Sequence, residues 1–366
     1  MEKINIYLPI VCKLINSALN NNTIDLSPYS HDDNFLKIIK EQTFSPFLYA
    51  VDKNKLYRES YFASYFVNEK FDKLAEYLKA ILDNNKIDHI FLKGFHLRKL
   101  YPLPHLRQMG DIDILVKPED YDIAKNTMIE NGAKLVHENE YHADFSINKL
   151  NVEIHKHLLS SNQQGEYDGY FNNPFEHSIK IDNHTFELKK QFNLIYLLTH
   201  YAKHLRNGAG IRELCDFYLL FKTNDYDVNN IYEIFKLENQ EKYIDTIFSA
   251  LKYIFNFEKY QFTYNDDIEL ILSYCLDCGI HGFGEQSERA KIEFTKTKEN
   301  KFIYLLKTLF ISVPELFKKY PWTKSIILIP LGYIVRFFYL LTNRNKNLFE
   351  VLSTTNENNI SKKIGL

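Results

Sequence analysis

The sequence predicts an α/β (α+β) fold in which a small mixed-sheet core is flanked by N-terminal and C-terminal helical regions. A chain of 366 residues is long enough to bury a large core and to form more than one subdomain. Apolar residues recur every three and four positions towards both ends, which is the spacing of amphipathic helices. Between residues 88 and 158 this spacing gives way to short β-branched runs separated by helical segments. That order is typical of an α/β core.

The first region, residues 1–86, is predicted to be helical. Residues 34–39 and 71–82 both show the apolar spacing of a helix, and Asn84 and Asn85 are expected to end the second helix. No positively charged start followed by an apolar run and a small-residue cleavage site is found, so we expect no signal peptide.

The core is predicted to contain two strand–helix units followed by more strands. Gly94 is expected to open a helix after the first strand, and Pro118 to begin the helix after the second. The predicted strands are 90–92, 111–116, 134–136, 143–147 and 151–155, the last of which is taken as the final strand. The predicted helices are 94–100 and 118–130.

The rest of the chain is again predicted to be helical. Helices are expected at 192–204, at 212–222, within 229–275 and within 299–320. The predicted organisation is a helical region 1–86, an α/β core 87–190, a helical domain 191–288, a basic helical segment 289–354 and a disordered tail 355–366.

Composition and charge predict the cellular location of the protein and the kind of partner that it binds. Four cysteines in so long a chain do not form a disulfide framework, so we expect a reducing, cytoplasmic location. From Arg289 onward there are 14 Lys or Arg and 5 Asp or Glu, although the whole chain has a net charge of −2. This basic end suits an anionic partner, or is simply a solvated helical surface. The apolar run 326–341 is too short to cross a membrane; it either lies peripherally on an anionic membrane or packs on the core.

Two aspartates on one predicted strand are the strongest functional signal. Asp111 and Asp113 are separated by one isoleucine, so both side chains lie on the same face of the strand while Ile112 and Ile114 face the core. Like charges held this close favour a cation between them. Glu153 lies between two apolar residues on a later strand and either joins the aspartates or points to solvent. Three carboxylates of this kind could hold Mg²⁺ (or Mn²⁺), as in phosphoryl and nucleotidyl transfer.

These residues resemble a known family. Lys93-Gly94, Arg107, the run Asp111–Val116 with Pro118-Glu119-Asp120, and Glu153 followed by His155 resemble the uncharacterised nucleotidyltransferase family of the polymerase-β-like superfamily. The resemblance implies Mg²⁺-dependent transfer of a nucleoside monophosphate from an NTP to an acceptor. The third acid of this family is usually Asp, whereas this chain has Glu153, and Gly94 is followed by Phe95 rather than a small residue.

The resemblance also implies roles for individual residues. Asp111, Asp113 and Glu153 would be the catalytic metal ligands, with Glu153 as a base toward the acceptor hydroxyl. Gly94 would let the triphosphate approach the backbone, and Lys93 and Arg107 would neutralise its charge, although Lys93 could equally reach solvent. His200 is expected near the nucleotide.

Residues after the core are open to more than one interpretation. His200 and His204 have a spacing that can bind zinc, but the glutamate of the metalloprotease motif is absent. Arg212, Glu213 and Asp216 either complete the wall of the site or form a buried ion-pair network.

Two rival functions remain open. The first is a catalytically inactive protein of the same fold that binds a nucleotide or a partner, which the departures at Glu153 and Phe95 favour. The second is a toxin-like transferase acting on tRNA or protein, which the basic C-terminal segment favours. The acceptor, whether small molecule, protein or RNA, is not specified by these motifs.

Overall fold

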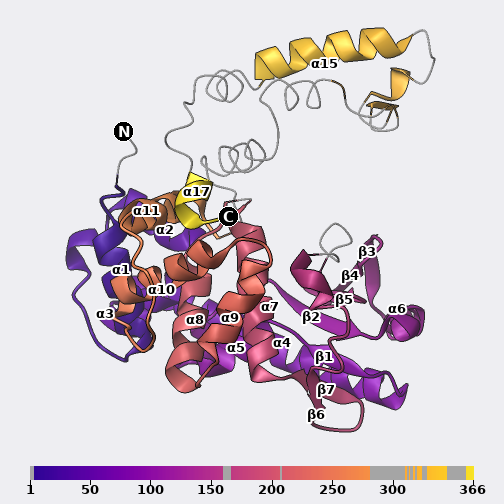
Figure 1. The fold of residues 1–366 in the computed structure, drawn as a ribbon, viewed down its shortest axis with the longest axis horizontal. Coiled ribbons are helices and arrows are strands. Elements are labelled where there is room, and N and C mark those ends of the chain that lie inside the picture. Colours follow the sequence, from indigo (N-terminus) through magenta and orange to yellow (C-terminus); the bar gives the residue numbers. More distant parts are fainter. Residues whose placement is uncertain are drawn as a thin grey trace.

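The computed structural model describes residues 4–159, 166–206, 208–280, short stretches between 310 and 343, and 360–366. Within these residues a mixed sheet lies beside a large group of helices, as Figure 1 shows. The predicted fold class, an α/β core flanked by helices on both sides in the sequence, is confirmed.

The sheet of the described residues has seven strands in the order β3-β4-β5-β2-β1-β7-β6. β2 pairs in parallel with β5, and β1 with β7, while the other neighbours are antiparallel. The strands are β1 His89–Phe91, β2 Asp111–Val116, β3 Lys134–Glu138, β4 His142–Ile147, β5 Leu150–His155, β6 Ser178–Lys180 and β7 Thr185–Leu188.

The prediction that residues 151–155 form the final strand is wrong, because β6 and β7 follow it. Both are short, and Ile179 of the edge strand β6 is exposed, so neither has the alternating apolar pattern of a half-buried strand. β7 joins the sheet beside β1, which lies about a hundred residues earlier in the chain. A local pattern does not reveal such a pairing.

One face of the sheet packs on two helices, α4 (Arg58–Asn84) and α6 (Tyr121–Glu130). Ile112 and Ile114 of β2 and Ile154 of β5 contribute fully buried side chains to this core. Because successive side chains of a strand alternate between faces, the residues between these isoleucines point to the opposite face. That face is directed toward the helical group.

The helical group combines both ends of the sequence around one hydrophobic core. Gln42 joins the two parts: its side-chain amide donates to the carbonyls of Cys275 and Leu276 and accepts from the backbone N–H of Ile211. The helices are α1 Leu8–Leu19, α2 Asp33–Glu41, α3 Ser45–Asp52, α7 Lys190–Leu205, α8 Arg212–Thr223, α9 Val228–Lys236, α10 Glu241–Phe255 and α11 Ile268–Cys278.

The chain end corrects one further prediction. Residues 360–366, expected to be part of a disordered tail, contain helix α17 (Ile360–Ile364), which packs against α10 and α11. Ile360 and Ile364 lie four residues apart on one face and are each 1% exposed. The polar composition of the tail conceals this short apolar face. Residues 355–359 lie outside the described part of the chain.

Helix α15 (Ile329–Asn343) covers most of the apolar run noted in the sequence. It exposes Leu331, Ile334 and Val335 by 49%, 51% and 39%, respectively. Among the described residues, no helix is both long and apolar enough to cross a membrane. Most of the predicted helical stretch 299–320, and the lysines at 318, 319 and 324, lie outside the described residues, so peripheral membrane binding stays a prediction.

Candidate functional site

The parallel pairing of β2 with β5 brings the predicted carboxylates together. Asp113 is directly opposite Glu153 in the register, and Leu115 is opposite His155. Ile112 and Ile154 are buried on the other face, as the alternation of the strand predicts. Asp111, Asp113, Glu153 and His155 therefore all line one cavity between the sheet and the helical group.

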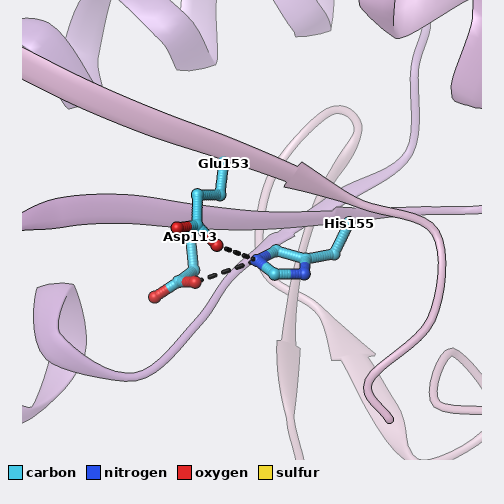
Figure 2. Close-up of side chains that lie close together, drawn as sticks. All are labelled: Asp113, Glu153 and His155. Atoms are coloured by element: carbon cyan, nitrogen blue, oxygen red, sulfur yellow. Dashed lines mark hydrogen bonds and ion pairs between the residues drawn. The ribbon is translucent and has the colours of Figure 1, made fainter. Parts of the chain in front are cut away.

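Asp113 is the centre of a compact charge cluster, of which Figure 2 shows Asp113, Glu153 and His155. One of its oxygens, Oδ1, accepts from Lys93 Nζ at 2.9 Å and lies 2.9 Å from His155 Nε2, which is also 3.2 Å from Glu153 Oε2. Burial opposes the charge on Asp113, but Lys93 and His155 outweigh it and hold the pKa of Asp113 well below its ordinary value. Burial likewise opposes charge on His155, whose pKa its two carboxylate partners nevertheless raise. Asp113 is therefore a stable anion.

Asp111 lies in a different electrostatic environment, although it is only two residues away. Burial and the negative charge of Asp113 raise its pKa to about 6. Within the described residues its carboxylate has no hydrogen-bond or ion-pair partner. The strand thus carries one compensated carboxylate and one uncompensated carboxylate, and the second would gain most from a bound cation.

The loop between β1 and helix α5 (Gly94–Leu97) places Lys93 in the site. The backbone of Lys93 has φ 47° and ψ −120°. Residues with a side chain rarely adopt this backbone conformation, because it is strained. A Cβ atom at position 94 would lie 2.6 Å from Nη1 of Arg107, so a larger residue here would force the guanidinium to move. The role of Gly94 toward the triphosphate, expected from the family resemblance, stays a prediction.

Arg107 connects the core to helix α8. Its Nε and Nη2 donate to Oδ1 and Oδ2 of Asp216, both at 2.8 Å, and the hydroxyl of Tyr101 donates to Oδ1 at 2.8 Å. Burial disfavours the charged guanidinium, but Asp216 raises the pKa of Arg107. Two nitrogens of Arg107 are therefore committed to Asp216, which leaves Nη1 facing Gly94. Both interpretations of Asp216 hold, because it forms a buried ion pair with Arg107 and also lines the cavity.

Helices α7 and α8 form the opposite wall of the cavity, which has a volume of about 530 Å³. This is within the usual range for small-molecule sites. From α7 come His200, Lys203 and His204, and from α8 comes Arg212. His200 and His204 share a hydrogen bond between their Nε2 atoms, 3.2 Å apart. Burial, with Lys93 and His204 nearby, keeps the pKa of His200 well below its ordinary value, so His200 is neutral near pH 7.

Comparison with known families agrees with this geometry. The family model described as an uncharacterised nucleotidyltransferase matches residues 35–255, which is more than half of the chain. The chain belongs to this nucleotidyltransferase family. The family resemblance seen in the sequence motifs is thereby confirmed. No curated protein and no solved structure matches the chain significantly.

The matched region includes every predicted site residue and the strands and helices that form both walls of the cavity. It spans α4, the sheet and helices α7 to α9, and ends with α10, so the α7 wall is part of the family domain. Helix α15 and the basic C-terminal segment lie outside it. The residues that the family resemblance assigns to the metal and the nucleotide therefore all lie within residues 35–255.

A metal ion would find its donors in this cavity on strands β2 and β5. Among the described residues, Asp113, Glu153 and His155 each offer a ligand atom, and these atoms lie within 4.8 Å of one another. Asp111 shares the cavity but does not belong to that compact set. Two carboxylates and an imidazole fit a divalent cation, so the donor chemistry is compatible with the metal that the family resemblance implies.

Several cavity residues were not assigned from the sequence. His155 follows Glu153 by two residues, so strand alternation could have placed it on the same face. Lys203 and Tyr196 lie on α7 and reach the cavity only because that helix lies across it from β2. Burial, helped by Lys93, lowers the pKa of Lys203, whereas burial raises the pKa of Tyr196 to about 12. No local signal distinguishes these two residues from others on the helix.

Proposed function

We propose that the protein transfers a nucleoside monophosphate from an NTP to an acceptor hydroxyl or phosphate, with a divalent cation, Mg²⁺ or Mn²⁺, as cofactor. One observation carries this proposal. Asp113 and Glu153 are register partners on parallel strands, with Asp111 on the same face, and they line a cavity whose opposite wall carries Lys203 and Arg212. Carboxylates on the strands opposite two basic side chains on the helices suit a metal–triphosphate complex.

In the proposed reaction an acceptor oxygen forms a bond to the α-phosphorus of the NTP. The bond from that phosphorus to the α,β-bridging oxygen breaks, and pyrophosphate leaves with the electron pair. Asp111, whose pKa is raised to about 6, or Glu153, which pairs with His155, would take the acceptor proton. A bound cation would stabilise the charge that develops on the phosphoryl oxygens.

The basic residues around the cavity would hold the phosphates. Lys93 directly precedes α5, and Nη1 of Arg107 lies beside Gly94, the first residue of that helix. Lys203 and His200 line the cavity from α7, so they could contact the phosphates from the other side. Since Lys93 pairs with Asp113 in the observed arrangement, binding of a cation and a triphosphate would exchange that partner for phosphate.

The test is the release of pyrophosphate from each of the four NTPs with Mg²⁺ or Mn²⁺, first with water and then with candidate acceptor mixtures. Wild-type protein is expected to release pyrophosphate from at least one NTP. The double variant Asp111→Asn/Asp113→Asn is expected to release none above background while keeping its circular dichroism spectrum. Equal release by the double variant would refute the proposed site.

One observation favours the catalytically inactive alternative. The ammonium of Lys93, 2.9 Å from Asp113 Oδ1, occupies a position that a cation could take in an active site. A protein of this kind would bind an NTP but release no pyrophosphate under any metal condition. The pyrophosphate assay therefore separates the two functions directly.

A further inference from the structure

We infer that His155 is a direct ligand of the cation in this cavity, so that the site has mixed nitrogen and oxygen donors and prefers Mn²⁺ to Mg²⁺. The inference rests on the proposed function only for the use of the ion in nucleotidyl transfer. Binding of the ion itself requires no nucleotide. The ligand set would be His155 Nε2 with carboxylate oxygens of Asp113 and Glu153.

The positions of these donor atoms support a shared ion. His155 Nε2 is 2.9 Å from Asp113 Oδ1 and 3.2 Å from Glu153 Oε2, as the dashed lines in Figure 2 indicate. Two donors that are each about 2.1 Å from one metal ion lie about 3.0 Å apart at a right angle and about 3.4 Å apart at a tetrahedral angle. The donors are thus already spaced as neighbouring ligands would be.

Burial and direction support the same conclusion. The side chains of Asp113 and His155 are 7% and 13% exposed, and Nε2 points at both carboxylates rather than at solvent. All three side chains line the cavity. An ion held between them would therefore be accessible to a triphosphate and yet largely shielded from bulk water.

A nitrogen donor changes the preferred metal. Mg²⁺ selects oxygen ligands and keeps much of its water, whereas imidazole is a good ligand for first-row transition ions. Two carboxylates with one imidazole leave coordination positions open, and Mn²⁺ accepts this mixture more readily than Mg²⁺ does.

A second donor set, His142, Asp144 and Glu153, competes for the same glutamate. His142 Nε2 lies 3.0 Å from Asp144 Oδ1, on strand β4. His142 lines the cavity but Asp144 does not, and the hydrogen-bond and ion-pair partners of Asp113 are Lys93 and His155 instead. The set that contains His155 is therefore the better candidate for an ion that serves the cavity, and the two sets can be told apart by substitution.

The decisive experiment is pulsed electron paramagnetic resonance on the full-length chain, freed of metal with a chelator and loaded with Mn²⁺ alone. Modulation from a directly bound imidazole ¹⁴N is expected in wild type, lost in His155→Gln, and kept in His142→Gln and His200→Gln. The last variant is a matched control, because His200 lines the same cavity on the helical wall. Absence of ¹⁴N modulation in wild type, or its loss in His142→Gln instead, would overturn the inference.

Calorimetric titration gives an independent readout of metal preference. Wild type should bind Mn²⁺ at least about tenfold more tightly than Mg²⁺, and His155→Gln should lose about tenfold in Mn²⁺ affinity with little change for Mg²⁺. The unfolding temperature of metal-free His155→Gln shows whether this variant is folded. If it is not, the wild-type spectrum and the wild-type titration still test the inference. Nitrogen ligation without pyrophosphate release would refute the proposed function alone. Pyrophosphate release without nitrogen ligation, or equal affinities for the two ions, would refute this inference alone.

Discussion

The two walls of the cavity are built in different ways. The strand wall takes its carboxylates from β2 and β5, whose register aligns Asp113 with Glu153. The helical wall takes Lys203 and Arg212 from α7 and α8, which reach the cavity through packing of the helical core. The strand wall gathers three carboxylates, and the helical wall carries the basic side chains of Lys203 and Arg212 beside the acids Glu213 and Asp216. The carboxylates of the first wall suit a cation, and the basic side chains of the second suit an anionic group. A metal-bound triphosphate has both parts, and this complementarity underlies the proposed function.

The largest expected effect is on the strand wall. Asp113→Asn should lower NTP turnover by about 10³-fold or more, because it removes a proposed metal ligand from the reaction centre. Pyrophosphate release under saturating NTP measures this loss. Circular dichroism shows whether the variant is folded. If turnover fell less than that of a helical-wall variant, the division of roles between the walls would be wrong.

The buried ion pair between Arg107 and Asp216 should contribute strongly to the free energy of unfolding. Asp216→Asn leaves the buried guanidinium of Arg107 without its counter-ion, so the free energy of unfolding should fall by about 3–5 kcal/mol. Urea denaturation measures the change. Glu258→Gln is the matched control, since it breaks an exposed ion pair with Lys252 and should change stability by less than about 1 kcal/mol. Similar losses in both variants would contradict the importance of the buried pair.

The two aspartates of β2 should respond to pH in opposite ways. The folded-state pKa of Asp111 is raised to about 6, so its ionisation destabilises the fold increasingly as pH rises from about 4 to 6. Asp111→Asn should therefore match wild type below pH 4 and exceed its stability by about 1–2 kcal/mol at pH 7, after allowance for solvent screening.

The stability of Asp113→Asn should depend on pH in the opposite sense to that of Asp111→Asn. The pKa of Asp113 is lowered by Lys93 and His155 against the effect of burial, so this aspartate contributes stability above the ordinary carboxyl pKa and loses it as pH falls. Asp113→Asn should be less stable than wild type at pH 7, and the difference should shrink in acid. Unfolding midpoints from pH 3 to 8 measure both series, and the same sign for both variants would contradict the assigned environments.

The smallest expected effect is on the helical wall. Lys203→Gln should raise the KM for NTP about tenfold and change kcat by less than about threefold, because a phosphate contact distant from the reacting bonds acts mainly on binding. Steady-state pyrophosphate release measures both constants. Lys236→Gln, an exposed lysine on α9, is the control and should leave both unchanged. A fall in kcat without a change in KM would place Lys203 at the reaction centre instead.

The strand wall could be predicted from the sequence better than the helical wall. Alternation along one strand is a local property, so Asp111 and Asp113 could be placed on one face from their spacing, and Ile112 and Ile114 on the other. The pairing of β2 with β5 was a hypothesis that the register confirms for Asp113 and Glu153. His155 followed from the same rule but was noted only as a family feature.

The remainder depended on contacts between residues distant in the chain. Asp216 holds Arg107 across 109 positions, and β7 pairs with β1 across a similar distance. Neither contact has a period or a motif that a local pattern can show. Helix α17 illustrates the same limit on a smaller scale, because two isoleucines in a polar tail are uninformative until α10 and α11 provide a surface for them.

The most direct test of the complementary walls is a thermal-shift series with an NTP, with Mg²⁺ or Mn²⁺, and with both together. The account predicts that the metal–NTP pair raises the unfolding temperature by more than the sum of the two separate shifts, because each ligand completes the site of the other. Asp113→Asn should abolish this excess. Additive shifts for every NTP and both metals, or an excess that persists in Asp113→Asn, would contradict the central claim that one cavity binds the metal and the triphosphate together.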